Sequence, residues 1–176
     1  TQTATNLTAT TYYRAVITSG SCAAANSAVA TVTVSPASVG GSIAGSATVC
    51  TGTNSTSLTL SGHTGSITRW ESSLDNFATA GTTIANTSTT QTETNLTATT
   101  YYRVAATNTP CSTGYSVVSS IIVQALPLAG EITSDQTINN AGDPAPFTSS
   151  TPASGDGTLT YIWQSSVSPF NTWNAI

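Results

Sequence analysis

The sequence predicts an all-β protein built from β-sandwich domains arranged end to end. Three observations predict it: a composition rich in Thr and Ser, short alternating apolar runs separated by turn residues, and a repeat of 89 residues. The repeat is the strongest of them, because Thr1–Arg14 returns as Thr90–Arg103 with the single change of Ala4 to Glu93. A repeat of this length is too long for one turn of a solenoid and fits a sandwich domain of about 100 residues.

The composition argues against nucleic acid and membrane as direct partners. Charged residues make up only 6% of the 176 residues, against roughly a quarter in an ordinary globular protein. The three basic residues are Arg14, Arg69 and Arg103, and the net charge is −4. Nucleic acid needs Lys and Arg to neutralise its phosphates, so no nucleic-acid partner is expected. No apolar run approaches the roughly 20 residues that span a bilayer, so no direct membrane insertion is expected either.

Strand signals recur at short spacing along the chain. Alternating or apolar runs cover residues 57–62, 66–72, 99–107 and 116–124, and turn-forming residues separate them. In the second run Ile67 is out of phase with Trp70, which predicts a bulge or a change of face there. The inward-facing positions predict a set of core residues: Leu58, Leu60, Trp70, Tyr102, Val104 and Trp163.

The repeat also predicts where one domain ends and the next begins. Pro-containing linkers at 35–41 and 125–130 frame a complete domain at 36–124. Residues 1–35 are then the C-terminal part of a preceding domain, and residues 125–176 are the N-terminal part of a following one. Half a sandwich cannot bury a core alone, so each end piece needs further sequence or a neighbouring copy.

The alignment of the repeats continues beyond the opening match, with two exceptions. Cys22 aligns with Cys111 at the same offset, whereas Cys50 aligns with Asn139. Trp70 meets Trp163 only at an offset of 93, which predicts four extra residues near "DPAP" or "SGDG" in the third unit.

Several of these segments resemble a known family. "GSIAGSATVCTGTNSTSLTLSG", the strand with Trp70, "TNLTATTYYRV" and "TPCSTGYSVVSSIIV" are similar to bacterial Ig-like domains. Those domains form long tandem arrays in large secreted surface proteins of Bacteroidota, including gliding-motility adhesins and substrates of type IX secretion. The resemblance covers essentially the whole chain and implies an extracellular Ig-like sandwich used as stalk or adhesin, without catalytic residues or a cofactor. Asn139 departs from the pattern, which has cysteine there.

The cysteines leave three alternatives open. Cys50 and Cys111 are the only pair within the complete domain, and a secreted sandwich favours a disulfide. In Ig strand order, however, they occupy turns at opposite ends, about 20 Å apart, whereas a disulfide needs Cα atoms within about 7 Å. The alternatives are a departure from Ig geometry, a disulfide between neighbouring domains, and free thiols. The partner of Cys22 then lies outside this sequence.

A candidate surface patch comprises Tyr101, Arg103 and Glu71, which share an outer face if their strands are neighbours. It predicts either a glycan-binding or surface-binding patch or a simple cross-strand ion pair. Trp70 and Trp163 are interpreted as core tryptophans, with a sugar-stacking platform as the alternative. His63 is the only histidine and lies in a loop without triad or metal partners, so no enzyme activity and no metal site are expected.

These observations together favour a structural and adhesive role. The chain is expected to be a repeat region of a large extracellular protein at a bacterial cell surface, forming a stalk or adhesin fibre in attachment or gliding. Its expected partners are neighbouring repeats of the same chain and polysaccharide or solid surfaces. The alternatives are spacer domains of a secreted polysaccharide-degrading enzyme and subunits of a filament joined by strand exchange.

Overall fold

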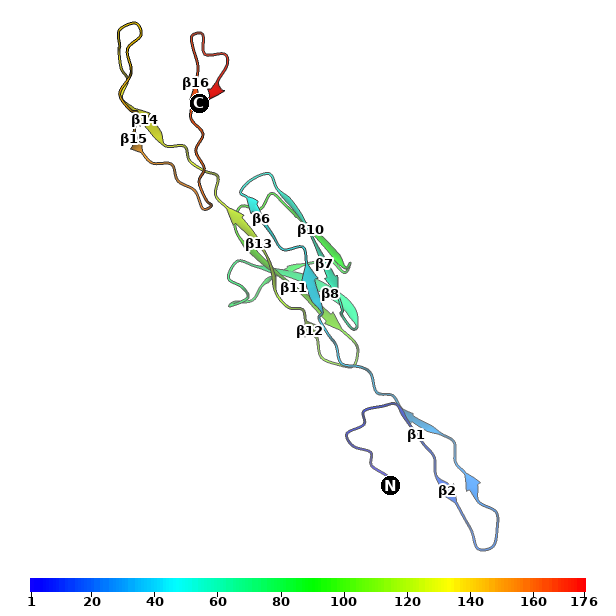
Figure 1. The fold of residues 1–176 in the computed structure, drawn as a ribbon. Helices are drawn as coiled ribbons and strands as arrows, with labels where there is room; N and C mark the ends of the chain where they lie inside the picture. Colours follow the sequence, from blue (N-terminus) through cyan, green and yellow to red (C-terminus); the bar gives the residue numbers. More distant parts are fainter.

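The computed structural model describes residues 1–176, and every regular element in it is a β-strand. Figure 1 shows an elongated molecule with a central body and a thin segment extending from each end. The prediction of an all-β protein is therefore confirmed.

Nine strands, β5 to β13, build two sheets in the central body. The first sheet has the order β10-β7-β5, and the second has the order β6-β13-β11-β8-β9 with β12 paired to β11. The strand bounds are β5 Ser42–Ala44, β6 Ala47–Cys50, β7 Ser55–Ser61, β8 Ser66–Ser73, β9 Thr82–Ile84, β10 Thr90–Thr94, β11 Thr100–Thr107, β12 Gly114–Tyr115 and β13 Ser119–Gln124. All pairs are antiparallel except β6 with β13, which are parallel.

One hydrophobic core lies between the two sheets, as in a β-sandwich. Strand β7 contributes Leu58 and Leu60, whereas the second sheet contributes the other four fully buried apolar side chains, Trp70, Tyr102, Val104 and Ile121. The indole nitrogen of Trp70 donates to the Ser88 carbonyl oxygen at 2.9 Å, so its one polar atom is satisfied inside the core. Five of the six predicted core residues are thus confirmed.

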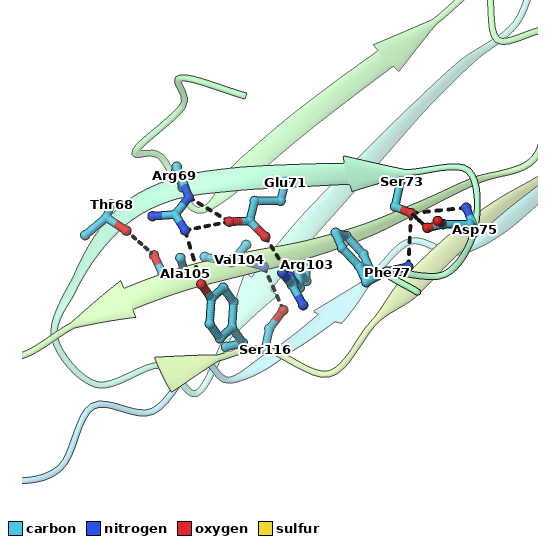
Figure 2. Close-up of polar contacts among 11 residues, drawn as sticks. Thr68, Arg69, Glu71, Ser73, Asp75, Phe77, Arg103, Val104, Ala105 and Ser116 are labelled. Carbon is cyan, nitrogen blue, oxygen red and sulfur yellow. Dashed lines mark hydrogen bonds and ion pairs between the residues drawn. The ribbon is translucent and has the colours of Figure 1, made fainter. Parts of the chain in front are cut away.

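A bulge in β8 resolves the phase conflict of the sequence. Ala105 pairs with Arg69 and Ala106 pairs with Ile67, so Thr68 is the extra residue. The Thr68 hydroxyl donates to the Ala105 carbonyl oxygen at 3.0 Å (Figure 2). The bulge lets Ile67 and Trp70 both contribute to the core although three positions separate them.

Close backbone contact explains why a glycine recurs at positions 41 and 130, the same position of two successive repeats. A Cβ on Gly41 would lie 2.2 Å from the Ser61 carbonyl oxygen, and φ there is +77°. The repeat-equivalent Gly130 has the same restriction, since a Cβ there would lie 2.2 Å from the Thr151 carbonyl oxygen. Only glycine fits such an approach, so the glycine recurs with the repeat.

The two end segments form thin ribbons without a core. Residues 1–35 hold β1 (Thr11–Tyr13), β2 (Val16–Ile17), β3 (Ala25–Asn26) and β4 (Ala30–Val32), paired as β1-β4 and β2-β3. Residues 125–176 hold β14 (Glu131–Thr133), β15 (Thr148–Thr151), β16 (Gln164–Ser165) and β17 (Asn174–Ala175), paired as β14-β15 and β16-β17. All fourteen buried residues of the chain lie between residues 40 and 121.

The prediction that Trp163 is a core residue is wrong within this chain. Its exposed fraction is 50%, whereas its repeat counterpart Trp70 is fully buried. The physical reason is incomplete cover, because β14 and β15 line an open pocket with Trp163 instead of packing closely on it, and no counterpart of β11 pairs with its segment. The four extra residues of this unit do not lie at "DPAP", because Ile132 pairs with Ser149 as Ile43 pairs with Leu60, an unchanged offset of 89. One extra residue is Ser150, at a bulge in β15, since Leu128 pairs with Ser154 as Val39 pairs with Thr64, an offset of 90; the other three lie between Ser154 and Trp163.

Candidate functional site

The most elaborate polar cluster lies on the outer face of the second sheet. Strands β8 and β11 align Arg103 with Glu71 and Val104 with Trp70. Because successive strand residues point to opposite faces, burial of Trp70 and Val104 in the core places Glu71 and Arg103 on the other face. The predicted proximity of Arg103 and Glu71 is confirmed. Tyr101 lies two positions along the same strand, opposite Ser73, and makes no hydrogen bond with them.

Glu71 is held between two arginines (Figure 2). Its Oε1 accepts from Arg69 Nε at 2.7 Å and contacts Arg69 Nη2 at 2.6 Å, and its Oε2 accepts from Arg103 Nε at 2.7 Å. The Glu71 side chain is only 6% exposed, whereas Arg69 and Arg103 are 33% and 26% exposed. The carboxylate is therefore covered by its own partners.

Two aromatic rings enclose the Arg103 guanidinium. Its central carbon lies 4.1 Å from the Phe77 ring centroid and 4.3 Å from the Tyr115 ring centroid. The Tyr115 hydroxyl also accepts from Arg69 Nη2 at 3.2 Å. Cation–π contacts at such distances add to the ion pair and leave little of Arg103 free for a ligand.

A hydrogen-bonded loop after β8 positions Phe77. The Ser73 hydroxyl donates to Asp75 and accepts from the backbone nitrogens of Asp75 and Phe77. Asp75 in turn accepts from the backbone nitrogen and the hydroxyl of Thr79. Asn76 and Phe77 have φ values of 56° and 60°, a left-handed region that asparagine tolerates but that is unfavourable for phenylalanine. The network around Ser73 and Asp75 holds that conformation and places the ring against Arg103.

Electrostatics keep this cluster charged. Burial alone would raise the pKa of Glu71, but hydrogen bonds and charge from Arg103 and Arg69 outweigh it and lower that pKa below its usual value. The hydrogen bond with Glu71 raises the pKa of Arg69 further. The Ser73 and Thr79 hydroxyl groups lower the pKa of Asp75. All these groups are ionised at neutral pH, so none is poised to transfer a proton there.

The cluster of Arg69, Glu71, Phe77, Arg103 and Tyr115, called the clasp below, therefore has a structural role on the outer face of the sheet. Glu71 and Asp75 do not form a carboxylate pair, because each is committed to different partners. No group of three or more His, Cys, Asp or Glu side chains lies close enough to hold a metal ion. The structure contains no helix that could cross a membrane.

Three members of the cluster were not predicted from the sequence: Arg69, Phe77 and Tyr115. Arg69 had a signal, because it precedes Glu71 by two positions and so lies on the same face of its strand. Phe77 had none, since its position depends on a loop with two positive φ values.

The three cysteines are all free, and the candidate disulfide between Cys50 and Cys111 is not formed. Cys50 ends β6 and pairs in register with Gln124, the last residue of β13. Cys111 lies at the other end, where its sulfur is 3.3 Å from the Pro36 carbonyl oxygen. The body of the sandwich separates them, because one is beside the linker that leaves the domain and the other beside the linker that enters it.

One of three comparisons with known proteins gives a match. No curated protein and no solved structure matches this chain. A family model described as a domain of unknown function (DUF8696) matches residues 1–36 and again residues 39–125. The two matches meet at the linker that precedes β5, and together they include most of the sequence. The chain therefore belongs to the DUF8696 family.

Proposed function

We propose that this chain is a stretch of tandem Ig-like domains from the structural and adhesive region of a large extracellular protein at a bacterial surface, where it forms a stalk or adhesin fibre. One observation carries the proposal: the chain enters the central sandwich at one end and leaves at the opposite end (Figure 1). A domain with this path joins its neighbours in a line and projects whatever lies at the tip.

The end segments support a tandem array because apolar residues that are buried in the central core are exposed at the equivalent positions of the end segments. Val32 is 43% exposed and corresponds to Ile121, which is fully buried. Residues 1–35 correspond to strands β10 to β13, and residues 125–176 correspond to the elements before β10. Each end thus presents one part of a sandwich with an apolar face that its missing part would bury, in line with the domain frame of 36–124.

The strand pairing suits a domain that bears tension. Four register pairs join β6 near the start of the domain to β13 at its end, in parallel. Inter-strand hydrogen bonds run across the strands. Force applied to the two linkers pulls β6 and β13 along their length in opposite directions, so it loads these bonds together rather than one at a time.

The surface chemistry supports contact with polysaccharide or solid surfaces. Thr and Ser dominate the exposed strands, and charged residues are 6% of the chain. Hydroxyl groups make many weak hydrogen bonds that salt does not screen. The resemblance to Bacteroidota surface arrays is the reason for placing such contact in attachment or gliding.

Single-molecule force spectroscopy on the 176-residue chain held at its two ends tests the mechanical part. We expect one dominant unfolding event that releases about 250 Å of chain, because roughly 85 residues extend to about 290 Å at about 3.4 Å each and the folded sandwich already spans about 40 Å. Thr51→Pro removes the bond from Thr51 N to the Gln124 carbonyl oxygen. It should lower the unfolding force markedly while equilibrium stability falls by only about 1 kcal/mol. An unfolding force unchanged by Thr51→Pro would overturn the proposal that β6 and β13 resist the applied force.

Adsorption tests the adhesive part. The same chain should bind polysaccharide-coated or glass surfaces with nearly equal affinity in low and high salt. A chain that does not adsorb favours the spacer alternative, and a steep salt dependence contradicts the hydroxyl mechanism.

A further inference from the structure

Cys50 and Cys111 lie at opposite ends of the central sandwich, each beside a junction with a neighbouring unit. Cys50 pairs in register with Gln124, and the next residue, Thr51, donates its backbone N–H to the Gln124 carbonyl oxygen at 2.8 Å. The Cys111 sulfur lies 3.8 Å from the carbonyl oxygen of Ser35 and 3.3 Å from that of Pro36.

The repeat makes the junction beside Cys50 equivalent to the junction beside Cys111. Ser35 and Gln124 are separated by the 89-residue offset, so Ser35 occupies the position at which β13 ends in the central unit, although β4 itself ends at Val32. At such a residue, the preceding unit supplies a cysteine at the position of Cys50, and the following unit supplies one at the position of Cys111. The Thr51 backbone nitrogen lies 2.8 Å from one of two repeat-equivalent carbonyl oxygens, that of Gln124, and the Cys111 sulfur lies 3.8 Å from the other, that of Ser35.

We propose that consecutive units are joined by a disulfide between the cysteine at the Cys50 position of one unit and that at the Cys111 position of the next. This inference rests on the tandem arrangement proposed above. It explains why Cys50 and Cys111 remain free in this chain: Cys111 pairs with a cysteine of the preceding unit, and Cys50 with one in the next unit's hairpin. Disulfides need Cα atoms about 4.4–6.8 Å apart, a separation that adjoining positions on one carbonyl group allow.

The surroundings of Cys111 favour this placement. The backbone nitrogen of Asn108 donates to the Ser38 hydroxyl and its side chain donates to the Pro36 carbonyl oxygen, both at 2.8 Å. The hairpin that carries Cys111 is therefore fixed to the linker, and its sulfur is directed toward the preceding unit. Cys50 is exposed at the opposite end.

The reaction needs an oxidant, and a small disulfide such as oxidised glutathione supplies it. The Cys50 thiolate attacks the glutathione disulfide and releases one glutathione thiolate. The second cysteine thiolate attacks the resulting mixed disulfide and releases the other. Two protein thiols are oxidised to one disulfide, glutathione disulfide is reduced to two thiols, and the two protons lost by the cysteines are taken up by the released thiolates.

A head-to-tail fusion of two complete chains supplies the missing partner. Residues 125–176 reach the position equivalent to residue 83 at the offset of 93, and residues 1–35 begin at the position equivalent to residue 90. A connecting segment that copies residues 84–89, IANTST, therefore completes one unit between the two copies. In it, Cys22 of the second copy occupies the Cys111 position and should meet Cys50 of the first copy.

The fusion contains six cysteines, and oxidation with oxidised glutathione should leave four free thiols. Peptide mapping should find Cys50 of the first copy linked to Cys22 of the second. Cys22→Ser in the second copy should leave Cys50 of the first copy as a free thiol. Asn139→Cys in the first copy should create a second disulfide, with Cys111 of the second copy. Asn140→Cys, one position along, is the matched control and should not.

Trp163 emission separates the two possible failures. A blue shift of the first copy's Trp163, relative to the single chain, reports that the new unit has folded. Folding with six free thiols, or with other pairings, would overturn the disulfide and leave the tandem array intact. No blue shift would overturn the repeat frame and the disulfide together.

Discussion

Replacing Glu71 with glutamine tests whether charge holds the clasp together. The change keeps the size of the side chain and removes the negative charge between Arg69 and Arg103. Removing one partner of a fully buried ion pair costs roughly 3–5 kcal/mol, and an exposed pair is worth about 0–1 kcal/mol. Glu71 is 6% exposed but its partners are 33% and 26% exposed, so we expect a loss of about 1–3 kcal/mol at pH 7.

The pH dependence gives the sharper result. The arginines lower the pKa of Glu71 in the folded state, so its contribution is fully present above the unfolded value of about 4.3. It is lost as the pH falls through the lowered folded pKa, because the protonated carboxyl then resembles glutamine. The stability difference between the wild type and Glu71→Gln should therefore shrink toward zero in acid.

Urea unfolding followed by tryptophan fluorescence measures this difference. Trp163 and Trp173 are replaced with phenylalanine in every variant, so that emission reports the fully buried Trp70. Glu131→Gln is the matched control, because it removes the same charge from an exposed carboxylate without an arginine partner, and it should change stability by less than about 0.5 kcal/mol. An equal loss for Glu71→Gln at pH 7 and pH 3 would refute the electrostatic reasoning.

Two further predictions use the repeat as an internal control. Ile121→Ala should lower the free energy of unfolding by about 2–5 kcal/mol because it empties part of the core, whereas Val32→Ala at the equivalent exposed position should change it by less than 1 kcal/mol in the same urea titration. Asn95 has φ of 56°, so Asn95→Gly should change stability by only a few tenths of a kcal/mol, while Asn95→Val should cost about 1–2 kcal/mol; equal effects of the two would contradict a left-handed requirement.

The sequence predicted most of the central sandwich because its signals there are local and periodic. Alternation identified β7, β8 and β11 and the inward-facing residues of each, and the phase conflict at Ile67 located the bulge. Asn6 and Asn95 both have φ near 55°, at 55° and 56°, so the recurring "TNLT" also encodes one recurring turn.

The sequence did not predict what depends on distant parts of the chain. Phe77 and Tyr115 reach Arg103 from a loop and a hairpin separated by 38 positions in the sequence, and no periodic pattern connects such segments. Trp163 has the pattern of a core residue, yet burial like that of Trp70 requires a complete opposing sheet and paired neighbouring strands, whereas here β14 and β15 only line an open pocket with it.

The two copies of the opening segment show that nearly the same sequence forms different secondary structure in different surroundings. Thr1–Arg14 and Thr90–Arg103 differ at one residue, yet the first forms a strand only at Thr11–Tyr13 while the second forms β10 and the first half of β11. Their propensities are nearly equal, so the difference comes from pairing: β10 and β11 lie against β7 and β8, and residues 1–14 have no such neighbours. In the fused chain, amide exchange in Thr1–Arg14 of the second copy should slow to the rates of Thr90–Arg103, while the first copy stays fast. Equally fast exchange in both opening segments would show that the strands offered by residues 125–176 do not pair with them.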